Sequence, residues 1–182
     1  MLIRPVRPSD AELLAEGFTR LSPESRRFRF LAGKPQLSAD ELRRLTDVDH
    51  RDHEAVGALD PRDGRGVGVA RFVRCADDPA AAEVAVTVVD AWHGRGVGTA
   101  LMRRLVARAN EEGITRFVAL IAADNYAVLA LLRSVGGEMR LTEHDGQTLE
   151  LSVELAPSAA APGGRARWSL VRRWSARRAV AG

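Results

Sequence analysis

The sequence predicts a single α+β domain in which helices flank one central sheet. Three observations support this fold class. The 182 residues are 46% hydrophobic and 28% charged, which is typical of one globular domain. Strand-like and helical patterns follow one another in the order β-α-α-α-β-β-β-α-β-α-β-β. A continuous apolar segment, Thr115–Ala122, comes between two helical patterns, as expected for a buried strand with a parallel neighbour.

The N-terminal quarter is predicted to hold one strand and three helices. Ile3–Arg7 is expected at a sheet edge or strand end, because Pro5 has no N–H to donate to a neighbouring strand. Ser9-Asp10 is expected to cap the first helix, and Ser22-Pro23-Glu24 to start a second. Ser38-Ala-Asp-Glu41 has the pattern of a capping box and predicts a third.

The central part is predicted to hold the main strands and the longest helix. Strands are expected at Glu54–Leu59, Val67–Arg74 and Ala82–Val89, joined by Asp, Pro and Gly turns. From Val97 to Asn110, one helical stripe is apolar and arginines occupy the opposite face. Gly113 is expected to end this helix.

The last third is predicted to hold a helix and a closing hairpin. Asp124-Asn125 is expected to cap a helix that stops at Gly136-Gly137. Glu138–Thr142 and Thr148–Leu155 are expected to pair around an Asp-Gly turn. The predicted domain therefore covers residues 1–155. Residues 156–182 are rich in Ala, Pro and Gly and then in Arg and Trp, which indicates a linker and a disordered tail.

The net charge of +3 hides two different parts of the chain. Residues 156–182 contain six arginines and no acidic residue, and without them residues 1–155 carry −3. A mildly acidic domain gives no support for specific nucleic-acid binding. The start of the chain lacks the apolar core of a signal peptide, and the single cysteine excludes an internal disulfide, so we expect a cytoplasmic protein. The basic tail could contact an anionic membrane or a partner protein.

The most informative motif is a glycine-rich pentapeptide that occurs twice. The copy at Gly94–Gly98 follows a predicted strand and opens directly into the long helix. Backbone N–H groups at a helix N-terminus form a site for a diphosphate, because the helix dipole also favours negative charge there. The copy at Gly64–Gly68 follows Asp60-Pro61 and leads into a strand, which indicates a hairpin turn. Only the copy at Gly94–Gly98 is therefore predicted to bind an anion.

The glycine loop does not fit the two commonest nucleotide motifs. A Walker loop ends in Gly-Lys-Ser/Thr, whereas Gly98 is followed by Thr99-Ala100. A dinucleotide fingerprint follows the first strand of a βαβ unit, whereas this loop follows the fourth predicted strand. The segment His93-Gly-Arg-Gly-Val-Gly98 instead resembles the Q/R-x-x-G-x-G/A signature of the GCN5-related N-acetyltransferase (GNAT) family.

The resemblance to this family extends over residues 2–155. Asn125–Gly137 is similar to the family's second element, N-x-x-A-x-x-L-Y-x-x-x-G-F. Ile3–Asp10, Leu21–Arg26 and Ala82–Val86 are similar to the acetyltransferase domain of bacterial protein lysine acetyltransferases. The resemblance implies the GNAT fold, a mostly antiparallel sheet that splays open between its fourth and fifth strands.

The resemblance implies acetyl-CoA as co-substrate and no metal. The diphosphate is expected on backbone N–H groups of the glycine loop, with Arg95 adding charge. The pantetheine arm is expected to pair with exposed backbone of the fourth strand and to form a hydrogen bond with Asn125, at the start of the helix after the fifth strand. The residues expected to bind the coenzyme are Val86, Val88, His93, Gly94, Arg95, Gly96, Val97, Gly98, Thr99 and Asn125.

Transfer of an acetyl group to an amine requires a base. A lysine amine with a pKa of about 10.4 is mostly protonated near neutral pH and must lose a proton to attack. Glu83 is the carboxylate within the predicted fourth strand, on one face with Ala85, Thr87 and Val89. We therefore expect Glu83 to be the catalytic base. A solvated acid at a strand end is the alternative interpretation.

Two departures from the family pattern affect the expected chemistry. Leu132 stands where many relatives have a tyrosine that protonates the leaving thiolate, so that role is vacant or the thiolate leaves unprotonated. His93 replaces the usual glutamine or arginine. His50 and His53 lie among aspartates, but nothing in their spacing fixes a metal geometry.

The sequence predicts direct transfer from acetyl-CoA to a primary amine in a ternary complex. The resemblance alone implies a protein lysine as acceptor. A small-molecule amine and a non-catalytic acyl-CoA sensor are the alternatives. The sequence does not indicate the oligomeric state.

Overall fold

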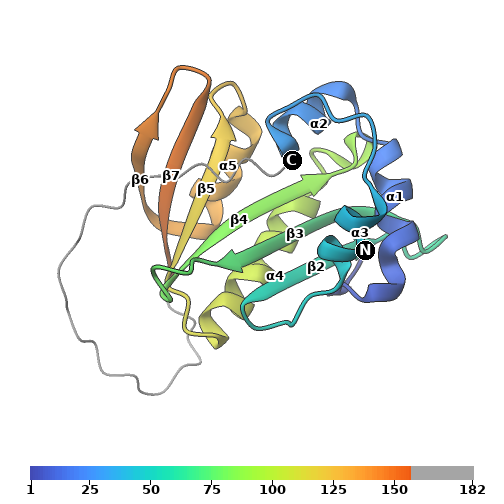
Figure 1. Cartoon of the computed structure of the whole chain (residues 1–182), viewed down its shortest axis with the longest axis horizontal. Coiled ribbons are helices and arrows are strands. Elements are labelled where there is room, and N and C mark those ends of the chain that lie inside the picture. The colour runs from blue at the N-terminus through green and yellow to red at the C-terminus, as the bar shows by residue number, and fades with distance from the viewer. Residues whose placement is uncertain (157–182) are drawn as a thin grey trace.

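Residues 1–156, which the structure describes, form a seven-stranded sheet in the order β1-β2-β3-β4-β5-β7-β6 in this computed structural model (Figure 1). The predicted order of strands and helices is confirmed throughout these residues. Apart from Ala156, the predicted linker and tail lie outside the described residues. The strands are β1 (Leu2–Pro5), β2 (His53–Leu59), β3 (Gly66–Arg74), β4 (Ala81–Val88), β5 (Arg116–Ala122), β6 (Gly136–His144) and β7 (Thr148–Leu155).

The sheet consists of two antiparallel parts joined by a short parallel contact. Strands β1 to β4 pair antiparallel in sequence order, and β7 pairs antiparallel with both β5 and β6. Between the two parts, β4 and β5 pair only where Ala81–Glu83 meets Arg116–Val118. Beyond Glu83 the two strands have no paired residues, which confirms the expected splay between the fourth and fifth strands. The proline-containing β1 is an edge strand, as predicted.

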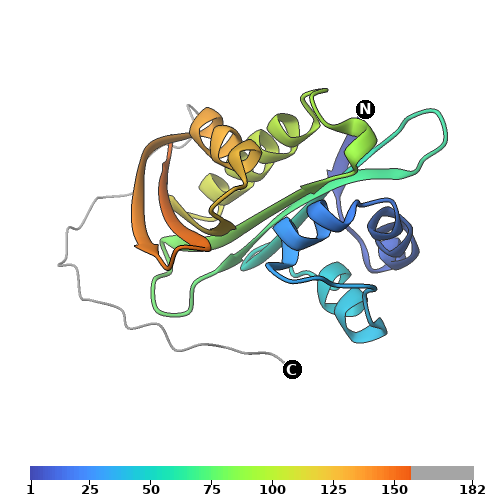
Figure 2. The ribbon, with the colours of Figure 1, turned by 90° about the horizontal axis from the view of Figure 1, so that it is seen from above.

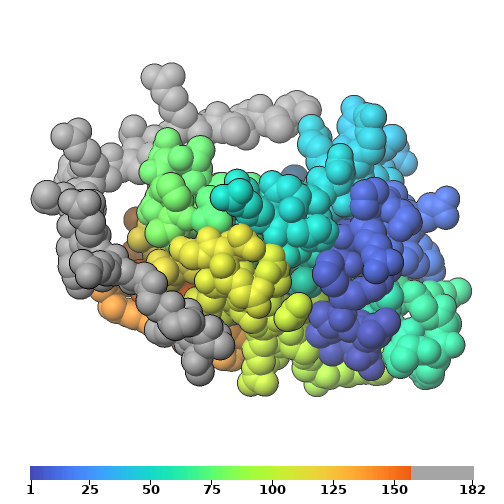
Figure 3. Space-filling model, turned by 90° about the horizontal axis from the view of Figure 1, so that it is seen from below, coloured from blue at the N-terminus to red at the C-terminus, as the bar shows by residue number. Residues whose placement is uncertain are grey.

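Helices cover both faces of the sheet, which places the strands in the middle layer (Figure 2). One face carries α4 and α5, and the other carries the three N-terminal helices. Seen from below, α4 (yellow-green to yellow) lies beside the teal strand β2 (Figure 3). No helix of the described residues is long and apolar enough to cross a membrane. The helices are α1 (Ala11–Thr19), α2 (Pro23–Phe30), α3 (Ala39–Thr46), α4 (Val97–Glu111) and α5 (Tyr126–Val135).

Most helix starts follow the predicted capping chemistry. Ser22 Oγ accepts a hydrogen bond from the Ser25 N–H at the start of α2, and Asn125 Oδ1 accepts one from the Val128 N–H at the start of α5. Ser38 forms the expected capping box of α3. The prediction for α1 was wrong in detail, because Asp10 occupies the cap position without capping the helix. Its carboxylate instead pairs with Arg4, at 2.7 Å, and so ties the edge strand to the domain.

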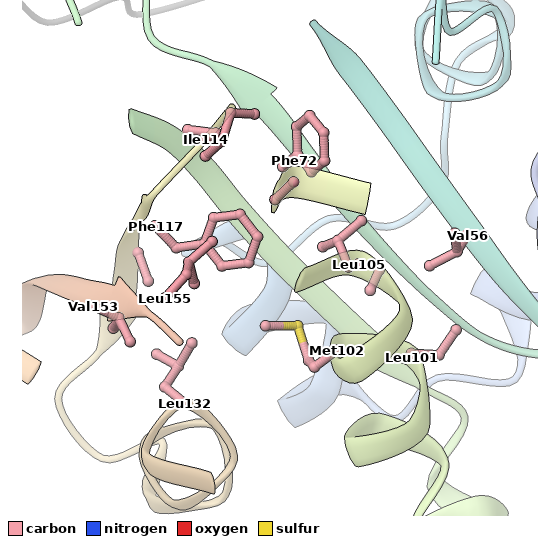
Figure 4. Close-up of a cluster of buried hydrophobic side chains, with 14 of the residues drawn as sticks. Val56, Phe72, Leu101, Met102, Leu105, Ile114, Phe117, Leu132, Val153 and Leu155 are labelled. Atoms are coloured by element: carbon pink, nitrogen blue, oxygen red, sulfur yellow. The ribbon is translucent and has the colours of Figure 1, made fainter. Parts of the chain in front are cut away.

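The core lies between α4 and the sheet and extends across both parts of the sheet (Figure 4). Leu101 and Leu105 of the predicted apolar stripe are fully buried. Phe72 of β3 and Phe117 of β5 contact each other with ring centroids 6.2 Å apart. Within the continuous apolar segment, Leu120 departs from the expectation: it is 55% exposed, because it points to the sheet face opposite to buried Ala119 and Ile121. The shared core therefore holds together two half-sheets that are barely hydrogen-bonded to each other.

Candidate active site

The split between β4 and β5 exposes backbone groups that a continuous sheet would pair. The Val89 N–H donates to the Val67 carbonyl at 2.9 Å, so odd-numbered residues of this segment direct their polar groups toward β3. Val84, Val86 and Val88 direct theirs toward the split, where β5 offers no pairing beyond Glu83. An extended ligand could add to this edge as a strand does, through main-chain hydrogen bonds.

The glycine loop follows β4 directly and leads into α4. Gly94 and Gly96 adopt φ angles of 69° and 76°, a left-handed conformation that costs an L-residue about 1–2 kcal/mol. A 3-10 turn at Asp90–Trp92 precedes them. His93 Nε2 donates to the Val88 carbonyl at 2.8 Å, which fixes the loop against the end of β4. The chain thus turns from strand to helix within a few residues.

The N-terminus of α4 is open to an anion. The first intrahelical bond runs from the Ala100 N–H to the Gly96 carbonyl, so the N–H groups of Val97, Gly98 and Thr99 precede the helical ladder. No side chain caps the helix, and its first turn has no acidic residue. Gly98 also allows close packing, because a Cβ there would lie 3.2 Å from Leu131 Cδ2. The electrostatic conditions for a diphosphate site are therefore met.

The split and the loop form one cleft of about 720 Å³. This volume falls within the usual range of small-molecule sites, about 300–1,000 Å³. The cleft brings together nearly all of the predicted coenzyme residues. Arg95 is the exception: it does not line the cleft, and its guanidinium carbon lies 5.1 Å from the centre of the Trp92 ring. The predicted residues that line the cleft are Val86, Val88, His93, Gly94, Gly96, Val97, Gly98, Thr99 and Asn125.

The second glycine pentapeptide occupies a different environment. Gly64 has a φ angle of 73°, close to that of Gly94, and its N–H donates to the Asp60 carbonyl at 2.8 Å. The following residues enter β3 and pair with β2. This copy is a hairpin turn, as predicted, and it does not line the cleft.

Glu83 lies at the closed end of the split, where the β4–β5 pairing stops. It pairs with Val73 on one side and with Val118 on the other. Its side chain is exposed and belongs to the sheet face that the N-terminal helices cover, since Val84, Val86 and Val88 pack on the core side. Glu83 is adjacent to the cleft wall but is not part of it.

Helix α2 forms the wall of the cleft opposite α5. Ser25, Phe28 and Arg29 line the cleft, whereas Arg27 forms an exposed 2.6 Å ion pair with Asp124. Helical geometry explains this difference, because only one face of α2 is directed toward β4.

Asp90 connects α2 to the end of β4, which the sequence did not reveal. Its carboxylate accepts hydrogen bonds from the Ser22 N–H, the Ser22 hydroxyl and the Ser25 hydroxyl at 2.9, 2.7 and 2.9 Å. Burial by itself raises the pKa of Asp90, but these hydrogen bonds outweigh it and lower the pKa. No local pattern marks a contact between residues so far apart in sequence.

Leu132 packs in the core, and His50 and His53 each lie beside a charged side chain of the fold. Leu132 is 1% exposed and packs near Val153 in the core (Figure 4). His50 Nδ1 lies 2.7 Å from a carboxylate oxygen of buried Glu54, and His53 Nε2 lies 3.2 Å from Arg71 Nη1. Within residues 1–156, no group of His, Cys, Asp and Glu side chains could hold a metal ion.

Comparison with known proteins agrees with this geometry. The family model described as "Acetyltransferase (GNAT) domain" matches residues 1–138. An acetyltransferase of Pseudomonas aeruginosa is 36% identical over 138 residues, which are 75% of this chain and 74% of that protein. Acetyltransferase Pat of Mycolicibacterium smegmatis is 36% identical over 134 residues, which are 74% of this chain but only 40% of that longer protein.

The solved structures include the GNAT domain of S. lividans PAT. It has 32% sequence identity and a TM-score of 0.77, and the match covers 84% of this chain and 89% of that domain. A phosphinothricin acetyltransferase of Sinorhizobium meliloti, solved in complex with acetyl-CoA, shares the fold with 19% identity and a TM-score of 0.66, over 88% of this chain and 95% of that one. The split sheet, the uncapped helix behind the glycine loop and these relatives lead to one conclusion: this chain belongs to the GNAT family and is an acyl-CoA-dependent N-acyltransferase.

Proposed function

We propose that this protein transfers an acetyl group from acetyl-CoA directly to a primary amine held in the same cleft. The observation that carries the proposal is the continuity of the unpaired β4 edge with the uncapped N-terminus of α4. The diphosphate binds the N–H groups of the glycine loop and of Gly98 and Thr99. The pantetheine arm extends along Val86 and Val88 toward Glu83, with Asn125 beside it on the opposite wall.

The backbone of β4 also activates the thioester in this arrangement. The Val88 carbonyl already accepts a hydrogen bond from His93, so the groups of this edge nearest the glycine loop that stay open are the Val88 N–H and both polar groups of Val86. An N–H that donates to the thioester carbonyl stabilises the negative charge that develops as the amine attacks. The amine forms the new C–N bond, and coenzyme A leaves as a thiolate. No tyrosine stands at position 132 to protonate it.

Glu83 is the proposed base, acting through a bridging water. Glu83 lies at the closed end of the split and is not part of the cleft wall, so we place one water between its carboxylate and the amine. General base catalysis typically contributes about 10²–10⁴-fold to a rate. We therefore expect Glu83→Gln to reduce kcat at neutral pH by about 100-fold or more and to leave the Kd for acetyl-CoA unchanged.

The matched control for this variant is Glu24→Gln. Glu24 is a carboxylate that lines the cleft from α2, and we expect its replacement to change kcat little. Rates are measured as thiol release and affinities by calorimetry. If Glu83→Gln keeps full activity and Glu24→Gln loses it, the catalytic base is Glu24 on α2 and not Glu83.

One calorimetric result and one kinetic result distinguish an enzyme from a non-catalytic acyl-CoA sensor. We expect saturable binding of acetyl-CoA and acceptor-dependent thiol release. Binding without release, over proteins and small amines as acceptors, would favour the sensor. No saturable binding would contradict the proposed coenzyme site itself.

A further inference from the structure

A second cavity lies beside the cleft, on the opposite face of the sheet from α4. It has a volume of about 80 Å³ and lies between the N-terminal helices and strands β3 and β4. Most of its wall is apolar, with leucines from α1 and α3 and the ring of Phe30. Its polar wall contains two arginines, Arg29 and Arg71. Arg29 and Thr87 also line the coenzyme cleft, so the two cavities adjoin.

These arginines lack acidic partners among residues 1–156. Arg71 is only 7% exposed, and its guanidinium donates to the Leu45 carbonyl at 2.9 Å and lies 3.2 Å from His53 Nε2. Arg29 is half-buried, with its guanidinium carbon 4.9 Å from the centre of the Phe30 ring. Neither forms an ion pair with a carboxylate of the described chain. By contrast, buried Glu54 on β2 pairs with Arg108 at 2.8 Å.

Two neighbouring cations, one buried and one half-buried, are electrostatically unfavourable without an anion. Burial lowers the pKa of Arg71, the positive charge of Arg29 lowers it further, and the result is about 9. Burial also lowers the pKa of Arg29. Folded proteins normally pair such charges, because an isolated buried ion loses its hydration without compensation. A carboxylate between the two guanidinium groups would supply that compensation through charge-assisted, bidentate hydrogen bonds.

The two arginines lie next to the proposed point of acetyl transfer. Arg71 pairs with Ala85 in the β3–β4 register, and Ala85 is two residues from Glu83 on the same face. Thr87, which both cavities share, follows on that face. An anion held by Arg71 and Arg29 would therefore lie close to the amine that Glu83 deprotonates.

We infer that the acceptor carries a carboxylate beside its amine, which Arg29 and Arg71 bind while an apolar group fills the leucine-lined cavity. This inference rests on the proposed function and narrows its substrate class. The carboxylate has two possible sources: the main-chain carboxylate of a free amino acid, or an acidic side chain next to a lysine in a protein. Cationic polyamines are disfavoured by the same arginines.

Two pairs of acceptors test the inference with the full-length protein. One pair is L-leucine and L-leucinamide, and the other is a lysine peptide with glutamate or glutamine beside the lysine. Binding is measured as a thermal shift in the presence of coenzyme A, and transfer as kcat/KM for thiol release. We expect the carboxylate member of at least one pair to exceed its neutral partner by about 10- to 100-fold, the typical effect of a charge-assisted hydrogen bond. The pair that responds identifies the source.

Arg71→Gln should abolish this preference, and Arg71→Lys should retain part of it. Arg43→Gln is the control, since Arg43 lies on α3 with its side chain 77% exposed. An unchanged thermal shift with acetyl-CoA shows that each variant is folded. Equal binding and transfer for both members of each pair, or a preference that survives Arg71→Gln, would overturn the inference. If acetyl-CoA itself causes no shift, the proposed function fails instead.

Discussion

At the scale of single residues, Gly94 and Gly64 have nearly the same backbone conformation but different functions. The element that follows each glycine makes the difference. They are the first glycines of the two identical pentapeptides, with φ angles of 69° and 73°. A Cβ at either position would meet nothing within 4 Å. Gly94 precedes a helix and Gly64 precedes a strand, and the helix gives the Gly94 copy convergent N–H groups.

This pair of glycines supplies a prediction with an internal control. Gly94→Ala and Gly64→Ala should each cost about 1–2 kcal/mol of stability, because both force alanine into the left-handed region. Only Gly94→Ala should weaken acetyl-CoA binding, by roughly tenfold if about 1.4 kcal/mol of phosphate contact is lost. Denaturant melts and calorimetry measure the two effects. Equal loss of affinity in both variants would show that strain, and not the loop's position, controls binding.

The same scale shows which site residues a sequence can reveal. The glycines of the loop, Val86, Val88 and Asn125 carry local patterns, and the structure places all of them in one cleft. Arg71 carries none, because an arginine that alternates with apolar residues in a strand indicates a solvent-facing position. It is buried because α1, α2 and α3 cover that face of the sheet, and the sequence of β3 contains no information about that cover.

At the scale of elements, α2 depends on a tether as well as on its own cap. Its predicted start at Ser22-Pro23 is confirmed, since serine and proline act locally. Its position over β4 comes from Asp90, which binds Ser22 and Ser25 across the mouth of the cleft. Local chemistry therefore predicted where the helix begins, whereas its place in the fold required a contact distant in sequence. The wrong prediction for Asp10 has a more local cause, since Arg4, on the strand just before it, competes successfully for its carboxylate.

Asp90→Asn tests the tether. The variant should lose about 1.5–3 kcal/mol of unfolding free energy, the usual contribution of hydrogen bonds to a charged group. Because α2 lines the cleft in which we propose that the amine binds, KM for the amine should rise while the Kd for acetyl-CoA stays the same. Asp40→Asn is the control, since Asp40 lies on α3 with its side chain 71% exposed. Unchanged stability and KM in Asp90→Asn would show that the hydrogen bonds of Asp90 do not hold α2 in place.

At the scale of the whole molecule, ionised carboxylates stabilise the fold. The pKa of Asp10 is lowered by its hydrogen bonds with Arg4, and those of Glu41 and Asp60 are lowered to about 2. The Glu54 pKa is also lowered, although burial opposes the effect of Arg108 and His50. A carboxyl group with a depressed pKa in the folded state contributes stability above its ordinary pKa, and this contribution is lost as pH falls.

We therefore expect the urea midpoint to fall as pH drops below about 4.5, the higher of the ordinary carboxyl values, toward about 2. Burial and the charge of Arg71 lower the pKa of His53, so its contribution starts to fall below pH 6.5. Asp10→Asn should show a shallower decline below pH 3.8, because it lacks one of the titrating groups. A midpoint that stays constant from pH 7 to pH 3 would contradict this assignment.

The interrupted pairing of β4 and β5 has a mechanical consequence for the whole molecule. Only three residues of β4 pair with three residues of β5, so the two parts of the sheet are joined at one end. Elsewhere they are held together by their packing against α4. A coenzyme lying across the opening would act as a removable cross-link between the two parts. Binding of the coenzyme would then make the protein more rigid, and its release would make the protein more flexible. The coenzyme-free protein would therefore be the most flexible form.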